Sequence, residues 1–334
     1  MTLPVGERRR NVRAVIMDAF ADTYAEGLRD RFPTVEFRTG DTAQGVLGQL
    51  ADAEILMAFD PSITREMIAE AQALEWVQAL TTGVDNLLAM PELRPEVLLT
   101  TLRGIHGPQM AELAFLYMLA FARDWRGQQA NQAARVWRRT PQPLLWKRTL
   151  VIVGVGAIGE AVARRAKAFE MEVVGVDLQP RPVPGVDRVY GAGDLAKALG
   201  EGDFVVVLTP YGPDTHHLID AKALMAMRPQ AYLINLARGG VVDEQALISA
   251  LDRGAIAGAG LDVFAAEPLA TDSRLWGHPR VLLTPHIGGM SDVYQAQALP
   301  IIEANLDAFL AGRPERMNNL VERRRSKSGG TQAP

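Results

Sequence analysis

Short apolar runs alternate with helix-like stretches along the first hundred residues. The apolar runs are Ala14–Met17, Val35–Phe37, Ile55–Phe59, Trp76–Leu80 and Val97–Leu99. The helix-like stretches between them include Asp22–Arg31, Thr42–Leu50 and Thr64–Ala73. This alternation is typical of βα units, in which parallel strands are buried on both faces. We therefore expect a parallel α/β sheet in this part of the chain.

A long helix and a second alternation follow. The helix is expected over 108–125, because Pro108 suits a first turn and apolar residues recur at helical spacing behind it. The polar stretch Arg123–Arg139 and the linker Thr140–Pro143 come next. Further strands are expected at Leu150–Val153, Glu172–Val176, Phe204–Leu208, Tyr232–Asn235, Gly258–Leu261 and Val281–Leu283. Further helices are expected at Ala157–Phe169, Leu195–Leu199, Ala221–Met227, Glu244–Arg253 and Ser291–Leu310. The pattern predicts two α/β lobes.

Composition narrows the function classes. At roughly 150 residues per domain, 334 residues favour two domains. The formal charge of −4 gives no reason to expect a nucleic-acid or membrane partner. There is no cysteine, which excludes disulfides and thiolate chemistry. The apolar stretch Ala114–Ala122 is far shorter than the ~20 residues that cross a bilayer, and no metal-ligand cluster is evident. We expect a cytoplasmic protein without a metal.

A glycine-rich turn predicts a dinucleotide site. The sequence Gly-Val-Gly-Ala-Ile-Gly follows strand 150–153 and opens a helix, whose N-terminus favours phosphate groups. The next strand ends at Asp177, where a carboxylate can bind the ribose hydroxyls of NAD and repel the 2′-phosphate of NADP. Arg181 argues for NADP, but the carboxylate favours NAD. The expected cofactor residues of this turn are Gly154, Gly156, Ala157, Ile158, Gly159 and Asp177.

Three further loops follow strands of the same lobe and carry groups suited to hydride transfer. Reduction of a 2-keto acid needs a cation for the substrate and a proton donor for the developing alkoxide. Arg238 supplies a permanent cation, and His286 can donate a proton near neutral pH. Glu267 would orient the imidazole. Because the carboxyl ends of parallel strands meet at one edge, we expect these three catalytic side chains to lie close together.

The ordered blocks resemble the D-isomer-specific 2-hydroxyacid dehydrogenases, which include glyoxylate/hydroxypyruvate reductases and phosphoglycerate dehydrogenases. The matching blocks are Val151–Gly159, Leu233–Asp243, Gly260–Phe264, Glu267-Pro268 and Thr284–Gly289. The resemblance implies that Arg238 binds substrate, that Glu267 pairs with His286, and that His286 is the general acid/base. It implies that Asp262 binds the nicotinamide carboxamide. The other residues that it places at the cofactor are Thr209, Pro210, Thr215, Ala237 and Gly288.

The resemblance also implies a domain arrangement. The substrate domain would be discontinuous, comprising 1–105 plus 290–322, with the NAD-binding Rossmann domain 106–289 inserted and a disordered tail over 323–334. Both lobes would be Rossmann-like or flavodoxin-like. In the first lobe, the backbone N–H groups of Thr82 and Gly83 would hold the substrate carboxylate. The helix 108–125 would lie at the hinge and dimer side of a homodimer.

Several alternatives remain open on the sequence. Trp137 either resembles a tryptophan that some relatives send to the partner's active site or packs on the long helix. Met290 departs from the family's usual residue, which leaves specificity open. Leu56-Met57 and Leu80-Thr81 suggest an apolar substrate lining, while glyoxylate, hydroxypyruvate and branched 2-keto acids all remain candidates. The alternative functions are an NADPH-preferring reductase and an NAD(H)-gated, corepressor-like interaction protein on the same fold.

Overall fold

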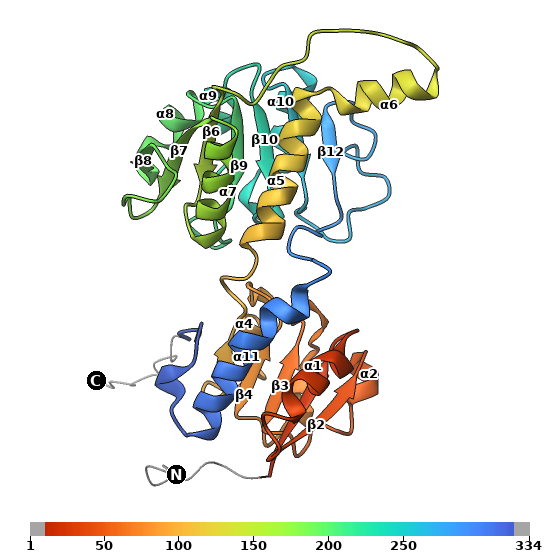
Figure 1. The fold of residues 1–334 in the computed structure, drawn as a ribbon, viewed down its shortest axis with the longest axis vertical. Coiled ribbons are helices and arrows are strands. Elements are labelled where there is room, and N and C mark those ends of the chain that lie inside the picture. Colours follow the sequence, from red (N-terminus) through yellow and green to blue (C-terminus); the bar gives the residue numbers. More distant parts are fainter. Residues whose placement is uncertain (1–10, 324–334) are drawn as a thin grey trace, which may run out of the picture. The chain divides into compact units, whose positions relative to one another are not determined.

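The computed structural model describes residues 11–323 and divides the chain into two compact units. Unit 1 comprises Met1–Ile105 and Asp292–Pro334, and unit 2 comprises His106–Ser291. Unit 2 is therefore continuous, whereas unit 1 is assembled from both ends of the chain (Figure 1). The expected tail over 323–334 lies, apart from Arg323, outside the described residues.

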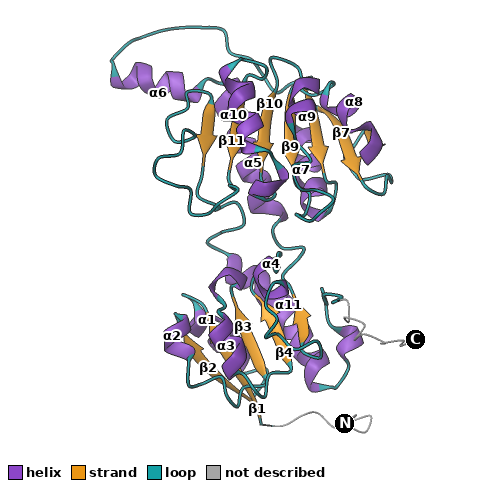
Figure 2. Cartoon of the chain, turned by 180° about the vertical axis from the view of Figure 1, so that it is seen from behind, coloured by secondary structure: helices purple, strands orange, loops and turns teal. Residues whose placement is uncertain are grey.

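Unit 1 contains a five-stranded parallel sheet in the order β2-β1-β3-β4-β5. Strands β3 and β4 are buried along their whole length because helices lie on both faces (Figure 2). The strands are β1 (Val12–Met17), β2 (Val35–Gly40), β3 (Ile55–Ala58), β4 (Trp76–Ala79) and β5 (Leu98–Thr100). The helices are α1 (Ala21–Arg29), α2 (Ala43–Val46), α3 (Arg65–Glu70), α4 (Asp85–Leu88) and α11 (Tyr294–Leu310), with short 3₁₀ turns at Asp60–Ser62 and Pro314–Arg316.

Helix α11 completes the core of unit 1 although it comes from the far end of the chain (Figure 1). Its Phe309 ring lies 5.3 Å from the ring of Trp76 in β4. Its Asn305 donates from Nδ2 to Oε1 of Gln78 at 2.9 Å, and both side chains are fully buried. A buried polar pair of this kind favours one register of the helix, because a shift would break a buried hydrogen bond.

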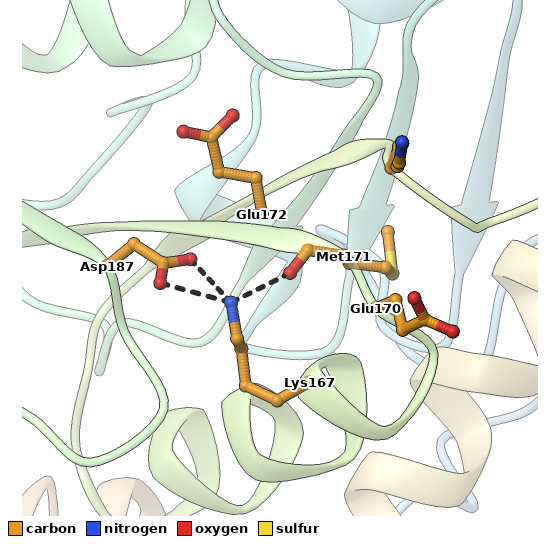
Figure 3. A pocket seen from close by; sticks show the side chains of 6 residues that line it. Lys167, Glu170, Met171, Glu172 and Asp187 are labelled. Atoms are coloured by element: carbon orange, nitrogen blue, oxygen red, sulfur yellow. Dashed lines mark hydrogen bonds and ion pairs between the residues drawn. The ribbon is translucent and has the colours of Figure 1, made fainter.

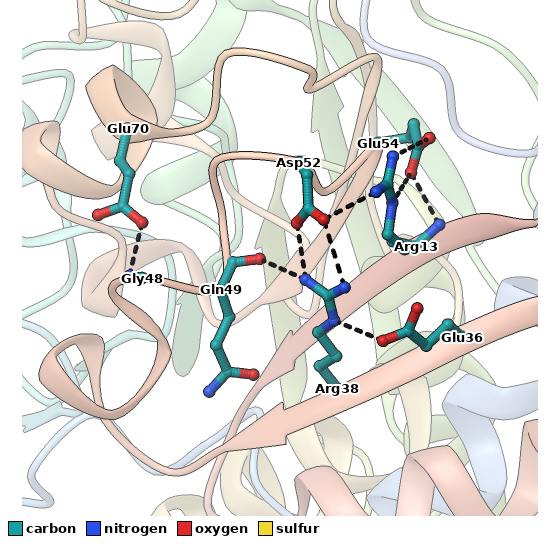
Figure 4. A network of polar contacts seen from close by, with 8 residues as sticks. All are labelled: Arg13, Glu36, Arg38, Gly48, Gln49, Asp52, Glu54 and Glu70. Atoms are coloured by element: carbon teal, nitrogen blue, oxygen red, sulfur yellow. Dashed lines mark hydrogen bonds and ion pairs between the residues drawn. The ribbon is translucent and has the colours of Figure 1, made fainter.

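A network of ion pairs joins β1, β2 and the segment before β3 (Figure 4). Arg13 and Arg38 each lie 2.7 Å from a carboxylate oxygen of Asp52. Arg38 also contacts Glu36, and Arg13 contacts Glu54. The hydrogen bond from Arg38 holds the pKa of the Asp52 carboxyl below its ordinary value. These charges satisfy one another at the surface, so they contribute little stability individually.

Unit 2 contains a seven-stranded parallel sheet in the order β12-β11-β10-β9-β6-β7-β8. From β6 the chain adds β7 and β8 on one side of the sheet, and it then crosses back to add β9 on the other side of β6. The strand order therefore reverses between β6 and β9, which is the topological switch point of the sheet. The strands are β6 (Thr149–Val153), β7 (Glu172–Asp177), β8 (Arg188–Gly191), β9 (Phe204–Val207), β10 (Tyr232–Asn235), β11 (Gly258–Leu261) and β12 (Val281–Leu283). The helices are α5 (Gly107–Ala122), α6 (Trp125–Ala133), α7 (Ala157–Ala168), α8 (Leu195–Leu199), α9 (Ala221–Ala226) and α10 (Glu244–Asp252), with short 3₁₀ turns at Ala192–Asp194 and Gly239–Val241.

The expected fold class, with two parallel α/β sheets, is confirmed, but three local predictions were wrong. The polar stretch after the long helix contains helix α6, which buries no side chain and therefore shows no apolar periodicity. Strand β8 was missed because it is a short edge strand without a fully buried residue. The second expected helix, Thr42–Leu50, is only the single turn α2. Within residues 11–323, none of the helices combines the length and apolarity needed to cross a membrane.

Candidate active site

The glycine turn after β6 has a different steric requirement at each glycine. Gly154 has a φ of 96°, and a Cβ there would lie 2.9 Å from the backbone of Leu208 and Thr209. A Cβ at Gly159 would lie 2.6 Å from the carbonyl oxygen of Gly154. At Gly156, by contrast, a Cβ would meet no described atom within 4 Å. The turn is therefore closed on the protein side and open above Gly156, which suits the approach of a pyrophosphate to the N-terminus of α7.

Asp177 is the last residue of β7 and is tied to this turn. Its Oδ2 accepts the N–H of Val155 at 3.0 Å, and its Oδ1 accepts the N–H of Gln179 at 3.1 Å. Each carboxylate oxygen can accept a second hydrogen bond, so the pair retains acceptor capacity for ribose hydroxyls. The Arg181 side chain is exposed. The carboxylate thus has two roles available: it shapes the glycine turn and can bind a sugar beside it.

The loop after β9 runs past the glycine turn. The hydroxyl of Thr215 donates to the carbonyl oxygen of Pro210 at 2.7 Å and closes the loop on itself. The hydroxyl of Thr209 is buried and has no hydrogen-bond partner within the described part of the chain. Buried hydroxyls are normally satisfied, so an unpaired one next to the glycine turn fits a bound polar group.

The turn after β10 presents Arg238. Asn235, which is 1% exposed, accepts the N–H of Ala237 at 3.1 Å and donates to the carbonyl oxygen of Arg238 at 3.1 Å. Gly239 follows, and a Cβ there would lie 1.8 Å from the carbonyl carbon of Phe264. No side chain fits in that space, so Gly239 lets the Arg238 turn contact the loop that carries Glu267.

Glu267 and His286 form a hydrogen-bonded pair at the carboxyl edge of the sheet. Oε2 of Glu267 lies 2.7 Å from Nδ1 of His286, and its Oε1 accepts the N–H of Phe264 at 2.9 Å. His286 has a φ of 54°, and its side chain is 45% exposed. A left-handed conformation is uncommon for residues other than glycine, and such strain concentrates at functional sites. The pair is thus held firmly on the glutamate side while the imidazole stays accessible.

Asp262 fastens the loop that carries His286. Its Oδ1 accepts the N–H of Ile287 at 2.9 Å and the hydroxyl of Thr284 at 2.5 Å, and its Oδ2 accepts the N–H of Gly288 at 2.8 Å. The side chain is 1% exposed. These contacts hold the loop around His286, so Asp262 positions this residue. The contact with the nicotinamide that the resemblance implies stays a prediction.

In unit 1, the turn after β4 is anchored in a similar way by Asp60. This aspartate is 3% exposed and accepts the N–H groups of Asn86 at 3.1 Å and Leu87 at 3.0 Å. The Asn86 amide in turn donates to the carbonyl oxygens of Asp60 and Ile63. Thr82 and Gly83 lie in the turn that these contacts hold, three to five residues before the anchored helix N–H groups.

Sequence reasoning missed the residues that support the site. Asp60 was not singled out, although an aspartate followed by proline directly after a strand is a recognisable start of a helical turn. Tyr117, one of the apolar-periodic residues of the long helix expected over 108–125, was not singled out either. Its hydroxyl lies 3.0 Å from the carbonyl oxygen of Leu261 and 2.6 Å from Oγ1 of Thr284, and burial raises its pKa. No local pattern reveals a contact between α5 and the segment after β12.

Two expectations about individual side chains were wrong. Leu56, Met57 and Leu80 are at most 1% exposed, so they belong to the core and line no open surface. They were misjudged because a parallel strand that is covered on both faces has no solvent-facing side. Trp137 is 88% exposed, which excludes the interpretation that it packs on α5 within one chain.

A hollow at the amino end of β7 contrasts with the site (Figure 3). Lys167 lies at its centre and donates to both carboxylate oxygens of Asp187, at 3.0 and 2.8 Å, and to the carbonyl oxygen of Met171. The lysine charge is thus neutralised by its own neighbours. This hollow lies at the edge opposite the glycine turn and offers no comparable chemistry.

Comparison with known proteins agrees with this geometry. Residues 115–288 match the family model described as the NAD binding domain of D-isomer specific 2-hydroxyacid dehydrogenases. A glyoxylate reductase from Thermococcus litoralis is 34% identical over 281 residues, covering 81% of this chain and 84% of that protein. A D-3-phosphoglycerate dehydrogenase from Methanocaldococcus jannaschii is 33% identical over 86% of this chain, which spans only 55% of that longer protein.

Solved structures extend the likeness to nearly the whole chain. A D-isomer specific 2-hydroxyacid dehydrogenase family protein from Aeromonas salmonicida has a TM-score of 0.88 and 32% identity, covering 93% of this chain and 99% of its own. An NADPH-dependent glyoxylate/hydroxypyruvate reductase from Sinorhizobium meliloti, in complex with NADP and sulfate, has a TM-score of 0.81 and 28% identity, covering 93% and 98%. The chain belongs to the D-isomer specific 2-hydroxyacid dehydrogenases, a family of oxidoreductases that use a nicotinamide cofactor.

Proposed function

We propose that this protein is an NAD-dependent oxidoreductase that interconverts a small 2-keto acid and its D-2-hydroxy acid. The observation that carries the proposal is the 2.7 Å hydrogen bond between Glu267 and His286 at the edge where the glycine turn and Arg238 also lie. A carboxylate-oriented imidazole can supply the proton that carbonyl reduction needs, and the guanidinium of Arg238 can supply the charge.

The hydrogen bond assigns the two ring nitrogens different roles. An ionised carboxylate only accepts, so Nδ1 of His286 carries the proton directed at Glu267. Nε2 is then the atom that exchanges a proton with the substrate. A reduced nicotinamide held at the glycine turn would supply the hydride for the carbonyl carbon. His286 gives its Nε2 proton to the carbonyl oxygen, which becomes the hydroxyl, and takes a proton back in the oxidation direction.

Substrate binding is proposed to use two kinds of donor. Arg238 contributes a planar guanidinium that suits the oxygens of a 2-keto acid. The backbone N–H groups of Thr82 and Gly83 hold the carboxylate, because successive backbone donors in a turn suit an anion. The Asp60 contacts support this assignment, since they fix the residues just after the turn through the N–H groups of Asn86 and Leu87, while the hydroxyl of Thr81 donates to the carbonyl oxygen of Gly83 at 2.7 Å.

The cofactor residues of unit 2 fit a dinucleotide. The open space above Gly156 would receive the pyrophosphate, and Asp177 would accept the ribose hydroxyls. The unpaired Thr209 hydroxyl would be satisfied by the same ligand. We favour NAD because the Asp177 carboxylate opposes a 2′-phosphate. The exposed Arg181 is the feature that favours NADP, the cofactor found in the Sinorhizobium meliloti reductase.

The test is oxidation of NADH and of NADPH, followed at 340 nm, with a panel of 2-keto acids. We expect turnover that produces the D-hydroxy acid and a lower KM for NADH than for NADPH. Tight NADH binding without turnover of any acid would overturn the enzyme and favour the cofactor-gated interaction protein. A lower KM for NADPH would overturn only the cofactor assignment.

We further propose that a second copy of the chain covers the surface around α6. Large apolar side chains are exposed along one continuous stretch of unit 2, from the outer face of α5 to the segment before β6, and Figure 1 shows α6 extending away from the sheet. An exposed apolar surface of this extent is typical of an interaction site. The exposed side chains are Leu116, Leu119, Trp125, Val136, Trp137, Leu144 and Trp146.

Sedimentation equilibrium tests this arrangement. We expect a dimer that dissociates when Trp125 and Trp137 are both changed to serine, whereas Met225→Ser, at an exposed apolar position in α9, leaves it intact. A monomeric wild-type protein at micromolar concentration would contradict the proposal.

A further inference from the structure

We infer that the substrate carries a bulky apolar side chain, which is recognised by Phe59 together with Phe20 and Leu88. The inference rests on the proposed function, because it takes the turn at Thr82 and Gly83 as the place where the substrate carboxylate is held. It goes further by naming the group attached to the keto acid and the residues that select it.

The sheet register places Phe59 beside the carboxylate turn. Ala58, the last residue of β3, is paired with Ala79 of β4, and the N–H of Leu80 donates to the carbonyl oxygen of Ala58 at 2.8 Å. Phe59 is therefore next to Leu80, two residues before Thr82. Met17 of β1 is paired with Ala58 on the other side, so the segment that leads to Phe20 starts from the same edge.

The side chains of Phe59 and Asp60 have opposite environments. Asp60 is 3% exposed because its carboxylate anchors α4, whereas Phe59 is 44% exposed. Phe20 is 56% exposed and Leu88, in α4 itself, is 53% exposed. Three large apolar side chains thus remain exposed in the segments that follow β1, β3 and β4, and covering them with an apolar substrate group would be favourable.

Most other aromatic side chains of unit 1 are shielded from solvent, unlike Phe20 and Phe59. Among the aromatic side chains that the structure describes there, Phe20 and Phe59 are the two that are exposed. The remaining ones are buried or half-buried, namely Tyr24, Phe32, Phe37, Trp76, Tyr294 and Phe309. The unit buries its aromatic residues elsewhere, so leaving two exposed at this edge points to a ligand at this edge.

The charges around the turn oppose a phosphorylated substrate. The loops that follow β1, β3 and β4 span residues 18–20, 59–64 and 80–84, and they contain Asp18 and Asp60 but no lysine, arginine or histidine. A phosphate group is normally bound by arginine, lysine or helix N-termini. In the loop after β5, Arg103 is exposed and His106 is buried.

The test measures kcat/KM of the full-length protein for glyoxylate, phenylpyruvate, 4-methyl-2-oxopentanoate and phosphonooxypyruvate, each with NADH and NADPH. We expect the two apolar acids to exceed glyoxylate by about tenfold or more, which is the scale of discrimination that an apolar pocket provides. Phosphonooxypyruvate should be the poorest substrate. Equal or better turnover of glyoxylate or phosphonooxypyruvate would overturn the inference while leaving the proposed function intact.

Substitutions of Phe59 and Phe20 test whether these two side chains recognise the apolar group of the substrate. Phe59→Ser should lower the ratio of kcat/KM for phenylpyruvate to that for glyoxylate by about tenfold, and Phe20→Ser should lower it in the same direction. Phe169→Ser is the matched control, because Phe169 is 40% exposed but follows α7 in unit 2, and it should leave the ratio unchanged. An unchanged ratio in both Phe59→Ser and Phe20→Ser would overturn the assignment of these residues to substrate recognition. Absence of turnover with every acid would instead contradict the proposed function itself.

Discussion

The two units fasten their functional loops with the same device, a buried aspartate that accepts backbone N–H groups. In unit 1, Asp60 accepts two N–H groups at the start of α4, and in unit 2, Asp262 accepts two N–H groups after His286. Both carboxylates are at most 3% exposed. Burial of a charge is costly unless it is fully hydrogen-bonded, so each loop is held in the one conformation that satisfies its aspartate.

The difference lies in what each loop presents. The unit 1 turn offers backbone dipoles, which have a fixed charge distribution and need only correct direction. In the proposed function, the unit 2 loop offers His286, which would change protonation state and is paired with Glu267. The same kind of anchor would then serve substrate binding in unit 1 and proton transfer in unit 2.

The largest expected effect comes from removing the proton-transfer group alone. His286→Ala should lower kcat by about 10²- to 10⁴-fold, the range for loss of a general acid/base. NADH affinity, measured by calorimetric titration, should change little because the glycine turn is untouched. Glu267→Gln should cause a smaller loss, since the amide can still contact the imidazole. Unchanged kcat in His286→Ala would remove this residue from the mechanism.

Changing the unit 2 anchor should damage both the loop and the chemistry. In Asp262→Asn, an amide nitrogen replaces one of the two carboxylate oxygens. In one orientation it faces the hydroxyl of Thr284 and the N–H of Ile287, and in the other it faces the N–H of Gly288, so donor meets donor in either case. A buried donor left unsatisfied costs roughly 1–3 kcal/mol. We expect a lower midpoint of thermal unfolding together with a lower kcat. Normal kcat with reduced stability would show that the anchor is structural only.

Changing the unit 1 anchor should instead affect substrate binding. Asp60→Asn places an amide nitrogen against the N–H of Asn86 or Leu87, with a similar cost of about 1–3 kcal/mol. We expect KM for the keto acid to rise while kcat and NADH affinity stay close to wild type. Steady-state kinetics with both substrates varied checks this split. An equal fall in kcat would contradict the assignment of the turn to binding.

The smallest effect concerns cofactor choice. Asp177→Ala removes the acceptor for ribose hydroxyls and also the contact with Val155. Loss of the Val155 contact should weaken NADH and NADPH alike, whereas loss of the ribose contact should weaken NADH further, by about tenfold. The ratio of the two dissociation constants isolates the second effect. A ratio equal to that of the wild type would remove Asp177 from cofactor discrimination.

The sequence predicted features that depend on local patterns. The strand–turn–helix context of Gly154–Gly159 was expected because apolar runs and glycine spacing are local properties. The anchoring role of Asp60 was not predicted, because its hydrogen-bond partners lie 26 and 27 residues further along the chain. The substrate lining was assigned to Leu56 and Met57, although apolar character alone does not distinguish a doubly covered strand from a surface. Exposure of Phe59 could be established only from the assembled sheet.

The origin of unit 1 from both ends of the chain has a consequence during synthesis. Helix α11 contributes Ala298, Ile302, Leu306 and Phe309 to the core around β1 and α1. At about 5–20 residues per second, a ribosome needs on the order of 10 to 40 s to add residues 106–291 before this helix begins. Throughout that interval the core around β1 and α1 lacks the apolar side chains that α11 contributes, while unit 2 emerges with all of its own strands. The core of unit 1 is therefore completed only after unit 2 has been synthesised.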